Sequence, residues 1–522
     1  MLDKTVVPTE QVLAGVSAVP ASPTVIEGHD VSGIPAEQKE EVINDLQDDW
    51  EDDPANARNW SPRKKWICVT IISLYSFVSP LPSSMLAPGL PDIAAKYGVT
   101  SSTLESLMLS IFVLSFSLGP LVLAPVSEMY GRTWVLHTGT LFSLAFNIGC
   151  AFSPNYQTFI AFRFLNGLSG SAPIACGGGS IGDLFTEHER ASAMAIYGLG
   201  PLIGPAVGPV VGGFIAQNIG PKYVFIIIAG ICGLSLAIGI PFLRETYAPV
   251  IRLRRAIADG DVEKAKHLRG PLSEISKRQY LWLNLSRPAI LLTHSFICFI
   301  LSLYMAYIYG NYYVMFTTFP TLFADVYGFN TGTGGLVYLG LGVGFIAATI
   351  FGARTAEQIY HHLAEKNSGK GKPEMRIPAL AFGSLFIPIG LFWYGWSAQA
   401  KIHWIMPIIG SGIFGFGEYT SSPWIFAWLT WKFLGMMTTF LPIQLYLVDA
   451  FEFAASALAA ASVMRSMFGF LFPLFGQQMY DALGIGGGNS LLGGLAIVLG
   501  IPFPIWIYYK GEAMRARNPL SR

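Results

Sequence analysis

A few charged side chains lie within long apolar stretches of this 522-residue chain, and each needs a chemical reason for its position. Arg163 lies about two helical turns into one stretch, Arg465 lies inside another beside Ser462 and Ser466, and Glu105 begins a third. Charges are costly in an apolar environment, so they pair, snorkel to an interface, or mark the path of a solute or proton. Arg163 could pair with a coupling acid or snorkel. Glu105 could load a proton or cap a helix, and Arg465 could pack or contact a substrate.

Aromatic and amide side chains in the same stretches are candidates for binding a solute. Tyr304 and Tyr307, in LSLYMAYIYGNYYVMF, are spaced i, i+3 and would share a helix face. Their rings could stack on a planar or cationic molecule, and Asn166 and Gln444 would add polar groups. The alternative for the tyrosines is aromatic core packing or an interfacial belt.

The sequence shows no pattern for catalysis, for a metal or for a cofactor. The five cysteines all lie in apolar runs, as small buried hydrophobes do. GLGVG at 340–344 lacks the GK[ST] of a phosphate-binding loop. The net charge of zero gives no indication of nucleic-acid binding. We therefore expect no enzyme, no metal, no cofactor and no nucleic-acid partner.

The elements that carry these residues are apolar runs, most of about 20 residues, which is enough to cross a bilayer as a helix. The chain is 52% hydrophobic and only 13% charged, with a mean hydropathy of +0.48. Helices of a soluble protein would show polar stripes, and most of these runs do not. The runs lie at 66–88, 104–126, 133–152, 157–180, 193–216, 222–243, 289–313, 332–353, 378–397, 402–448, 455–479 and 489–509. We expect an all-α membrane protein embedded in a lipid bilayer.

Basic residues alternate between connections and predict the orientation of the chain. They precede the first run and fill the even-numbered connections, whereas the odd connections hold few, namely Lys96, Lys222 and Lys401. The positive-inside rule then places both termini and the even connections in the cytoplasm. The longest connection separates six runs from six. The expected regions are a disordered acidic tail (1–60), a first half (61–243), a cytoplasmic loop (244–288), a second half (289–509) and a cytoplasmic tail (510–522).

GLGPLIGPAVGPVVGG, at 198–213, places many helix breakers in a buried-looking run. Glycines recur every four residues on one helix face, at Gly200, Gly204, Gly208 and Gly212. Such a face lets a neighbouring backbone approach closely. Prolines on a second face, at Pro201, Pro205 and Pro209, permit bending. The helix could pack tightly and still rock, or the glycines could serve packing alone.

Two six-helix halves around a cytoplasmic loop are typical of alternating-access transporters. More specifically, GPLVLAPVSEMYGRTWV (119–135), RFLNGLSGSAPIACGGGSIGDLF (163–185) and GPLIGPAVGPVVGG (200–213) resemble motifs of the major facilitator superfamily. DDPANARNWSPRKKW, LRETYAPVIRLRR and YLVDAF are similar to its fungal twelve-helix drug:proton antiporter branch. The resemblance covers about residues 50–515. It implies the major facilitator fold, with twelve transmembrane helices in two pseudo-symmetric halves.

The resemblance also implies roles for particular residues. Arg163 would take part in proton coupling, although no acid lies within the first span to accept the proton. Glu128 and Arg132 match the motif between helices 2 and 3, and Arg132 would pair with Asp183 to close the cytoplasmic side, with Arg190 opening the next helix. The antiporter motif of helix 5, which would act as a pivot, comprises Gly200, Gly204, Pro205, Gly208, Pro209, Gly212 and Gly213.

These observations predict a proton-coupled antiporter, a monomer in a fungal plasma membrane, that exports small amphipathic or cationic molecules. Drugs, toxins, secondary metabolites and polyamines are examples, and its partners would be that substrate and protons. One alternative is a proton symporter that takes up a small solute. Another is a membrane receptor or scaffold without transport. The helix 5 motif argues against the symporter, and the intramembrane charges and glycine face argue against the scaffold.

The run at 402–448 does not fit this scheme. As one helix it would be roughly 70 Å long, and as two spans it would place the basic tail outside, against the charge rule. Removing 418–435 restores a normal tenth helix. The codons of this stretch can be read as a small fungal intron, with a donor at Gly417, a branch point at Leu429–Thr430 and an acceptor at Leu434–Gly435. We hypothesise a retained intron, against the alternative of a real insertion.

Overall fold

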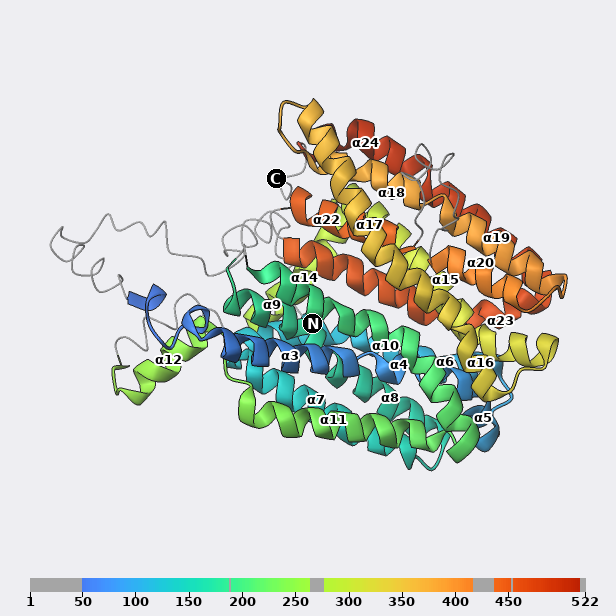
Figure 1. Cartoon of the computed structure of the whole chain (residues 1–522), viewed down its shortest axis with the longest axis horizontal. Helices are drawn as coiled ribbons and strands as arrows, with labels where there is room; N and C mark the ends of the chain where they lie inside the picture. The colour runs from blue at the N-terminus through green and yellow to red at the C-terminus, as the bar shows by residue number, and fades with distance from the viewer. Residues whose placement is uncertain (1–48, 187–188, 263–276, 416–435, 452–453, 517–522) are drawn as a thin grey trace, which may run out of the picture.

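The computed structural model describes residues 49–186, 189–262, 277–415, 436–451 and 454–516. These residues form helices and no strand. Figure 1 shows the helices running along the long axis of the molecule in two groups. The first half, blue to green, fills the lower part of the view, and the second half, yellow to red, fills the upper part. The all-α architecture predicted from the apolar runs is confirmed.

The first half contains six spans, and proline or glycine interrupts two of them. The first span changes direction after Val78, where Pro80 and Pro82 withhold backbone hydrogen bonds. The fourth is divided at Ser171, just before Pro173. The elements are α3 Pro62–Val78 with α4 Leu81–Ser84, η3 Ala87–Gly89 and α5 Leu90–Lys96; α6 Ser102–Tyr130; α7 Arg132–Ala151; α8 Tyr156–Gly170 with α9 Ala172–Leu184; α10 Arg190–Ile219; and α11 Lys222–Phe242.

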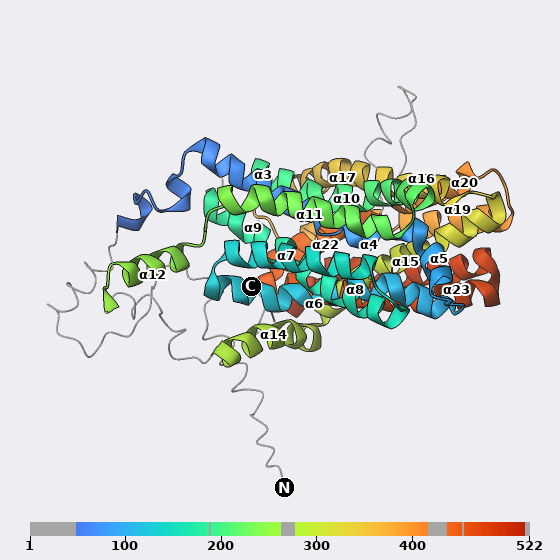
Figure 2. The ribbon, with the colours of Figure 1, turned by 90° about the horizontal axis from the view of Figure 1, so that it is seen from below.

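Two helices of the described chain belong to the connection between the halves. α12 (Ala248–Ala258) extends beyond one end of the bundle, and α14 (Lys277–His294) lies along its edge (Figure 2). The expected boundary between loop and second half, at 288/289, falls inside α14. The next span starts only at Phe296, where Ser295 caps the helix by accepting a hydrogen bond from the Cys298 N–H.

The second half repeats the six-span plan. Its last two spans form one long element, α23, whose path turns at Gly484, where φ is 72°. Glycine adopts this left-handed conformation without the cost of a Cβ atom. The elements are α15 Phe296–Tyr327; α16 Thr331–Val337 with α17 Leu339–Lys366; η5 Pro373–Arg376 with α18 Ile377–Gly383 and α19 Phe386–Gln399; α20 Ile405–Gly415; α22 Met436–Ala450; α23 Ala454–Gly500; and α24 Pro502–Arg515.

Seven of the described helices or helix chains are long and apolar enough to cross a membrane. One of these, Ala454–Arg515, has 62 residues and contains two spans. The bundle is completed by α7, by α8 with α9, by α16 with α17, and by α20 with α22. α15 is the most enclosed, with 83% of its apolar window buried. It therefore lies at the centre of the molecule.

The tenth span is shared between two helices. α20 has 11 residues and α22 has 15, and each alone is shorter than the roughly 20 residues that a bilayer requires. The predicted insertion at 418–435 lies outside the described residues.

Candidate functional site

The glycine face of α10 packs directly on the backbone of the first span. A Cβ atom on Gly200 would lie 2.8 Å from the Phe77 nitrogen, and one on Gly212 would lie 2.0 Å from the Met85 carbonyl oxygen. Gly204 and Gly208 face the same span. The four glycines are buried, so the four-residue spacing in the sequence corresponds to one continuous line of close helix contact.

A second face of α10 packs on the other half. A Cβ atom on Gly213 would lie 2.7 Å from the carbonyl oxygen of Thr331, and one on Gly335 would lie 2.6 Å from that of Pro209. Further along, Ala206 lies against Gly342 in the same way. α10 therefore contacts the first span and the eighth span (α16 with α17) at once, and it connects the two halves.

The halves are also joined by hydrogen bonds near one end of the bundle, the end at which α6 and α16 begin. The Gln478 amide donates to the Thr103 hydroxyl over 2.8 Å. The backbone N–H of Gly332 donates to the Gln217 side-chain oxygen, also over 2.8 Å. The hydroxyl of Thr331 donates to Asp92. We call this the polar-gate end, and the opposite end, which carries Arg132, the basic end.

Arg163 is completely buried in the first half, so it does not snorkel to an interface. Its Nε donates to the carbonyl of Met108 and its Nη2 to that of Leu109, each over 3.1 Å, while Nη1 donates to the carbonyl of Pro82. The guanidinium also lies 4.9 Å from the centre of the Phe112 ring. Three carbonyl oxygens hold the charge, and no acid of the described chain forms an ion pair with it. Arg163 thus ties α8 to the first two spans.

Arg465 has a different environment, in α23 of the second half. Its guanidinium lies 4.7 Å from the centre of the Tyr309 ring, and its Nη2 is 3.4 Å from the hydroxyl oxygen of Ser462. The side chain is partly exposed. Arg465 therefore has far weaker polar contacts than Arg163.

Tyr304 and Tyr307 point toward the last span instead. A Cβ atom on Gly500 would overlap the Tyr304 hydroxyl, and the Tyr307 hydroxyl donates to the carbonyl of Leu492. Both tyrosines are at least 97% buried. This position favours the packing interpretation that the sequence left open.

The remaining polar candidates lie on three different helices. Asn166 is fully buried in a network with Ser143 and Asn147, within the first half. Gln444, on α22, is partly exposed. Glu105 lies in the first turn of α6 and is also partly exposed. Among the described residues, the guanidinium of Arg465 contacts Ser462 and Tyr309 and forms no hydrogen bond with any of these three.

At the basic end, Arg132 and Asp183 form the ion pair that the resemblance implied. Arg132 Nε donates to Asp183 over 2.6 Å, and the guanidinium lies 4.9 Å from the centre of the Tyr247 ring. Glu245 accepts hydrogen bonds from the backbone N–H groups of Arg132 and Thr133, which begin α7. A carboxylate at a helix N-terminus satisfies free donors and is favoured by the helix dipole.

Two neighbours of this pair behave differently. Glu128 accepts a hydrogen bond of 2.6 Å from the Tyr280 hydroxyl, so it connects α6 to the helix between the halves. Arg190 begins α10 and is exposed.

The second half has a matching ion pair that sequence reasoning missed. Arg376, just before α18, donates to Asp449 near the end of α22 over 2.6 Å, as Arg132 does to Asp183. Glu374 is buried and pairs with Arg515 over 2.8 Å. The signal was present: Asp449 lies in YLVDAF, and a basic residue opens the ninth span as Arg132 opens the third. The pseudo-symmetry of the halves therefore extends to their ion pairs.

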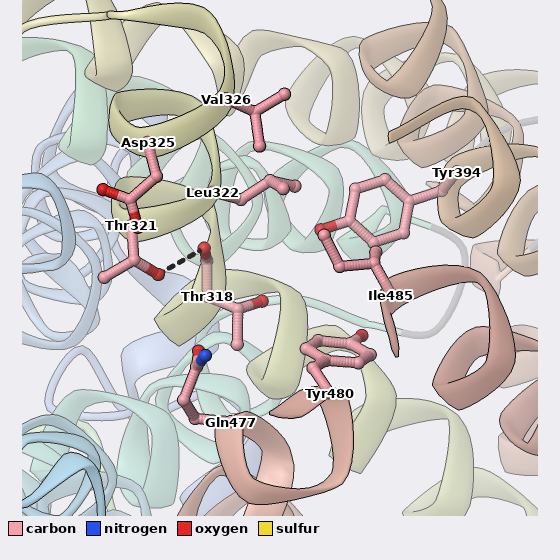
Figure 3. Close-up of a pocket in the computed structure, with 9 residues that line it drawn as sticks. All are labelled: Thr318, Thr321, Leu322, Asp325, Val326, Tyr394, Gln477, Tyr480 and Ile485. Carbon is pink, nitrogen blue, oxygen red and sulfur yellow. Dashed lines mark hydrogen bonds between the residues drawn. The ribbon is translucent and has the colours of Figure 1, made fainter. Parts of the chain in front are cut away.

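A cavity of about 110 Å³ lies within the second half, between α15, α19 and α23 (Figure 3). In Figure 3 the hydroxyl of Tyr394 and the amide of Gln477 point into it, and Thr321 donates to the Thr318 carbonyl oxygen at its wall. Drug-sized ligands occupy pockets of roughly 300–1,000 Å³. This cavity has room for water or a small polar group only, so it is not the binding site of an amphipathic substrate.

Comparisons with known proteins agree with this geometry. A family model described as Major Facilitator Superfamily matches residues 72–473. The chain is 40% identical to a protein named efflux pump radE of Floropilus chiversii, over 96% of this chain and 90% of that one. It is 41% identical to the MFS transporter cpaT of Aspergillus oryzae, over 94% and 96% of the two chains.

Two solved structures share the fold at low sequence identity. The xylose transporter XylE from E. coli, in a partially occluded inward-open conformation, matches with a TM-score of 0.59 and 14% identity, over 85% of this chain and 99% of that one. A peptide transporter POT in complex with sulfate matches with a TM-score of 0.60 and 14% identity, over 87% and 96%. At such identities the likeness concerns the fold alone.

Proposed function

The chain belongs to the major facilitator superfamily, and on that premise we propose that it is an exporter of small amphipathic molecules that works by alternating access in exchange for protons. The observation that carries export is the 40% identity, over nearly the whole chain, to a relative named an efflux pump. The symport alternative has no such support from the relatives. The exchange with protons is argued instead from particular side chains of this protein.

We place the basic end in the cytoplasm of a multi-pass protein of the plasma membrane, acting as a monomer. Arg132, Arg376 and Arg515 gather there, and basic residues favour the cytoplasmic face. The hydrogen bonds between the halves then lie at the extracellular side. In this arrangement the protein is closed to the outside, and its substrate would enter from the cytoplasm.

Transport requires the two halves to rotate relative to each other, and α10 is the helix about which they would rotate. Its glycine face has no side chains that interdigitate with the first span, so a small rotation breaks few contacts. The cytoplasmic ion pairs Arg132–Asp183 and Arg376–Asp449 lie each within one half and keep the helix ends in register. Partly exposed pairs contribute up to about 1 kcal/mol, and because both partners lie in the same half, each pair stabilises its own half and does not bridge the two.

Proton coupling needs a group that binds the proton and a fixed charge that responds to it. Glu105 is the acid nearest to Arg163 along α6, because Met108 and Leu109, which accept hydrogen bonds from Arg163, lie one turn further on. A proton on Glu105 would change the charge near the outer end of α6. Arg163 would convey this change to the first span, because it holds the Pro82 carbonyl.

An imposed pH gradient across proteoliposomes tests the proposed exchange. The solute is a compound to which host cells become resistant when the protein is expressed. We expect it to move against the proton gradient. Movement with the protons would establish symport, and no movement with correctly inserted protein would favour a receptor or scaffold.

Arg163→Ala is expected to abolish uphill export, because no other cation of the described first half contacts these carbonyl oxygens. Each lost hydrogen bond to a charged group costs about 1.5–3 kcal/mol, so the amount of protein in the membrane must be measured beside transport. Arg163→Lys retains the charge but not the planar geometry and should keep a fraction of the activity. Uphill export by Arg163→Ala at the wild-type rate would contradict the assignment.

A further inference from the structure

Arg465 is a cation within a membrane-spanning helix, several turns from either end of that span. It lies in α23 about 16 Å, at 1.5 Å per residue, from the helix start at Ala454. The turn at Gly484 is further away in the other direction. An ionisable side chain at this depth marks a functional site by default, and its partner identifies the function.

The polar contacts of Arg465 leave much of its hydrogen-bonding capacity unused. Its Nε is buried and has no acceptor, and the contact of Nη2 with Ser462 is long, at 3.4 Å. Arg163, by contrast, is fully buried with three carbonyl acceptors. The hydrogen-bonding capacity of Arg163 is therefore satisfied by backbone carbonyls, and that of Arg465 is not.

An aromatic wall lies beside this cation. The Tyr309 ring, on which the guanidinium stacks, is 5.1 Å from the ring of Tyr313 and 6.3 Å from that of Phe440 on α22. Gly469, one turn after Arg465, has no side chain and so leaves room for Tyr309 and Tyr313. Tyr309 and Arg465 are both partly exposed, so they remain accessible to a solute that enters the bundle.

Acidic side chains of the described chain are confined to the two ends of the bundle. Glu105, Asp325 and Asp481 lie toward the polar-gate end. Glu128, Asp183, Glu374 and Asp449 lie at the basic end. None of the described acids forms an ion pair with Arg465. An ammonium group at this depth would find no counter-ion here, whereas a carboxylate would find an unsatisfied guanidinium.

We infer that Arg465 and Tyr309 recognise the exported molecule, and that this molecule carries an acidic group, such as a carboxylate or an ionised enol or phenol, attached to a planar ring system. The guanidinium donates to the acidic oxygens, and the ring packs on Tyr309. This inference rests on the proposed export function and narrows its substrate class: molecules with an acidic group are preferred over polyamines and other organic cations.

Three probes that share one ring system test the inference. They are 9-anthracenecarboxylate, 9-anthracenemethanol and 9-(aminomethyl)anthracene, which present an anion, a neutral group and a cation. Binding to the purified full chain in lipid nanodiscs at pH 7 is followed by fluorescence anisotropy, with protein-free nanodiscs subtracted. We expect the carboxylate to bind about tenfold more tightly than either other probe, which corresponds to about 1.4 kcal/mol.

Variants assign the preference to Arg465. Arg465→Gln is expected to bind the carboxylate and the alcohol about equally, with unchanged affinity for the alcohol, which shows that the site is folded. Arg465→Lys should retain part of the preference. The matched control is Lys96→Gln, which removes another cation that stacks on a tyrosine, 5.0 Å from the centre of the Tyr97 ring, near the polar-gate end of the bundle. It should bind as the wild type does.

Several results would overturn the inference. These are tighter binding of the amine than of the carboxylate, no saturable binding of the carboxylate to the wild type, or a carboxylate preference that survives Arg465→Gln. If Arg465→Gln does not fold, a carboxylate preference in Arg465→Lys that equals that of the wild type would also count against it. The assay uses no proton gradient. A failure of proton-coupled export would therefore leave the binding result intact, and a failed binding preference would leave export intact.

Discussion

Replacing Gly212 by alanine is expected to abolish export, whereas replacing Gly198 by alanine is expected to leave export at the wild-type level. Both residues lie in α10, and alanine favours a helix over glycine by about 1 kcal/mol at either position. The difference lies in what the new methyl group meets. At Gly212 it would lie 2.0 Å from the carbonyl oxygen of Met85, and at Gly198 it would meet nothing within 4 Å.

The Met85 backbone cannot move aside as a flexible side chain can. Forcing an extra methyl group into such a contact costs about 1–3 kcal/mol, and the strain falls on the contact between α10 and the first span, where the halves are expected to pivot. The effect of alanine at each of the other glycines should depend on the atoms that the glycine faces. Gly200 faces backbone, Gly208 faces the movable Ser84 hydroxyl at 2.3 Å, and Gly204 faces the Pro80 ring at 3.0 Å. Alanine should therefore be tolerated best at Gly204.

Initial transport rates, each divided by the amount of folded protein in the membrane, check this order. Leucine is too large for the space at either Gly204 or Gly208. Gly204→Leu and Gly208→Leu should therefore each abolish efflux while the protein still reaches the membrane. If Gly212→Ala and Gly198→Ala transported equally well, close packing of α10 on the first span would not be needed for the cycle.

The sequence was informative about α10 because spacing alone determines which residues share a helix face. Four glycines four residues apart must line up, whatever the rest of the fold. The apolar runs were equally reliable, since a bilayer requires about 20 apolar residues per span. The pair Arg132–Asp183 followed from the family resemblance and not from spacing.

The substrate candidates were harder to assign because α15 is apolar around its whole circumference. The periodicity of such a helix does not indicate which face points to the centre. Tyr304 and Tyr307 share a face, as their spacing required, but that face lies against Gly500 and Leu492 of the last span. Tyr309, two residues further along, faces Arg465 instead.

Ion pairs between spans that are far apart in the sequence could not be predicted, for a similar reason. Arg376 and Asp449 are 73 residues apart in the sequence, and each is an ordinary charge at a helix end. Only the packing of α18 against α22 brings them together. The separation of 51 residues between Arg132 and Asp183 does not transfer to this pair, because about 55 residues still separate Arg376 from Asp449 once 418–435 is left out.

The chain without residues 418–435 is expected to be the active exporter, and the full 522-residue chain is expected to be inactive. α20 and α22 pack on successive parts of the same neighbouring spans. Gly410 of α20 lies against Tyr394 of α19, whereas α22 packs on α18, which precedes α19 in the ninth span. Both also contact α17. They therefore form the outer and inner parts of a single span.

The ends of these two helices agree with a single crossing. α20 begins just after the connection that contains Lys401, at the end of the bundle where α19 ends, and α22 ends beside Asp449, which pairs with Arg376 where the ninth span begins. Joining residue 417 to residue 436 would give a helix of about 40 Å, enough to cross the apolar core of a bilayer. Eighteen residues in the middle of that span, with the charges of Glu418 and Lys432, have no place in such a helix.

Two measurements decide the matter. The expressed transcript should lack the 54 nucleotides that encode 418–435, and the shortened chain should export while the full chain should not. A chain with eighteen glycine and serine residues in place of 418–435 is the matched control, and it should be as inactive as the full chain, because any insertion at this point divides the tenth span. Mature messages that uniformly retain these codons, together with export by the full chain alone, would establish 418–435 as a real part of the protein. The tenth span would then be a broken helix, and Phe440 and Asp449 would hold its inner part in place through Tyr309 and Arg376.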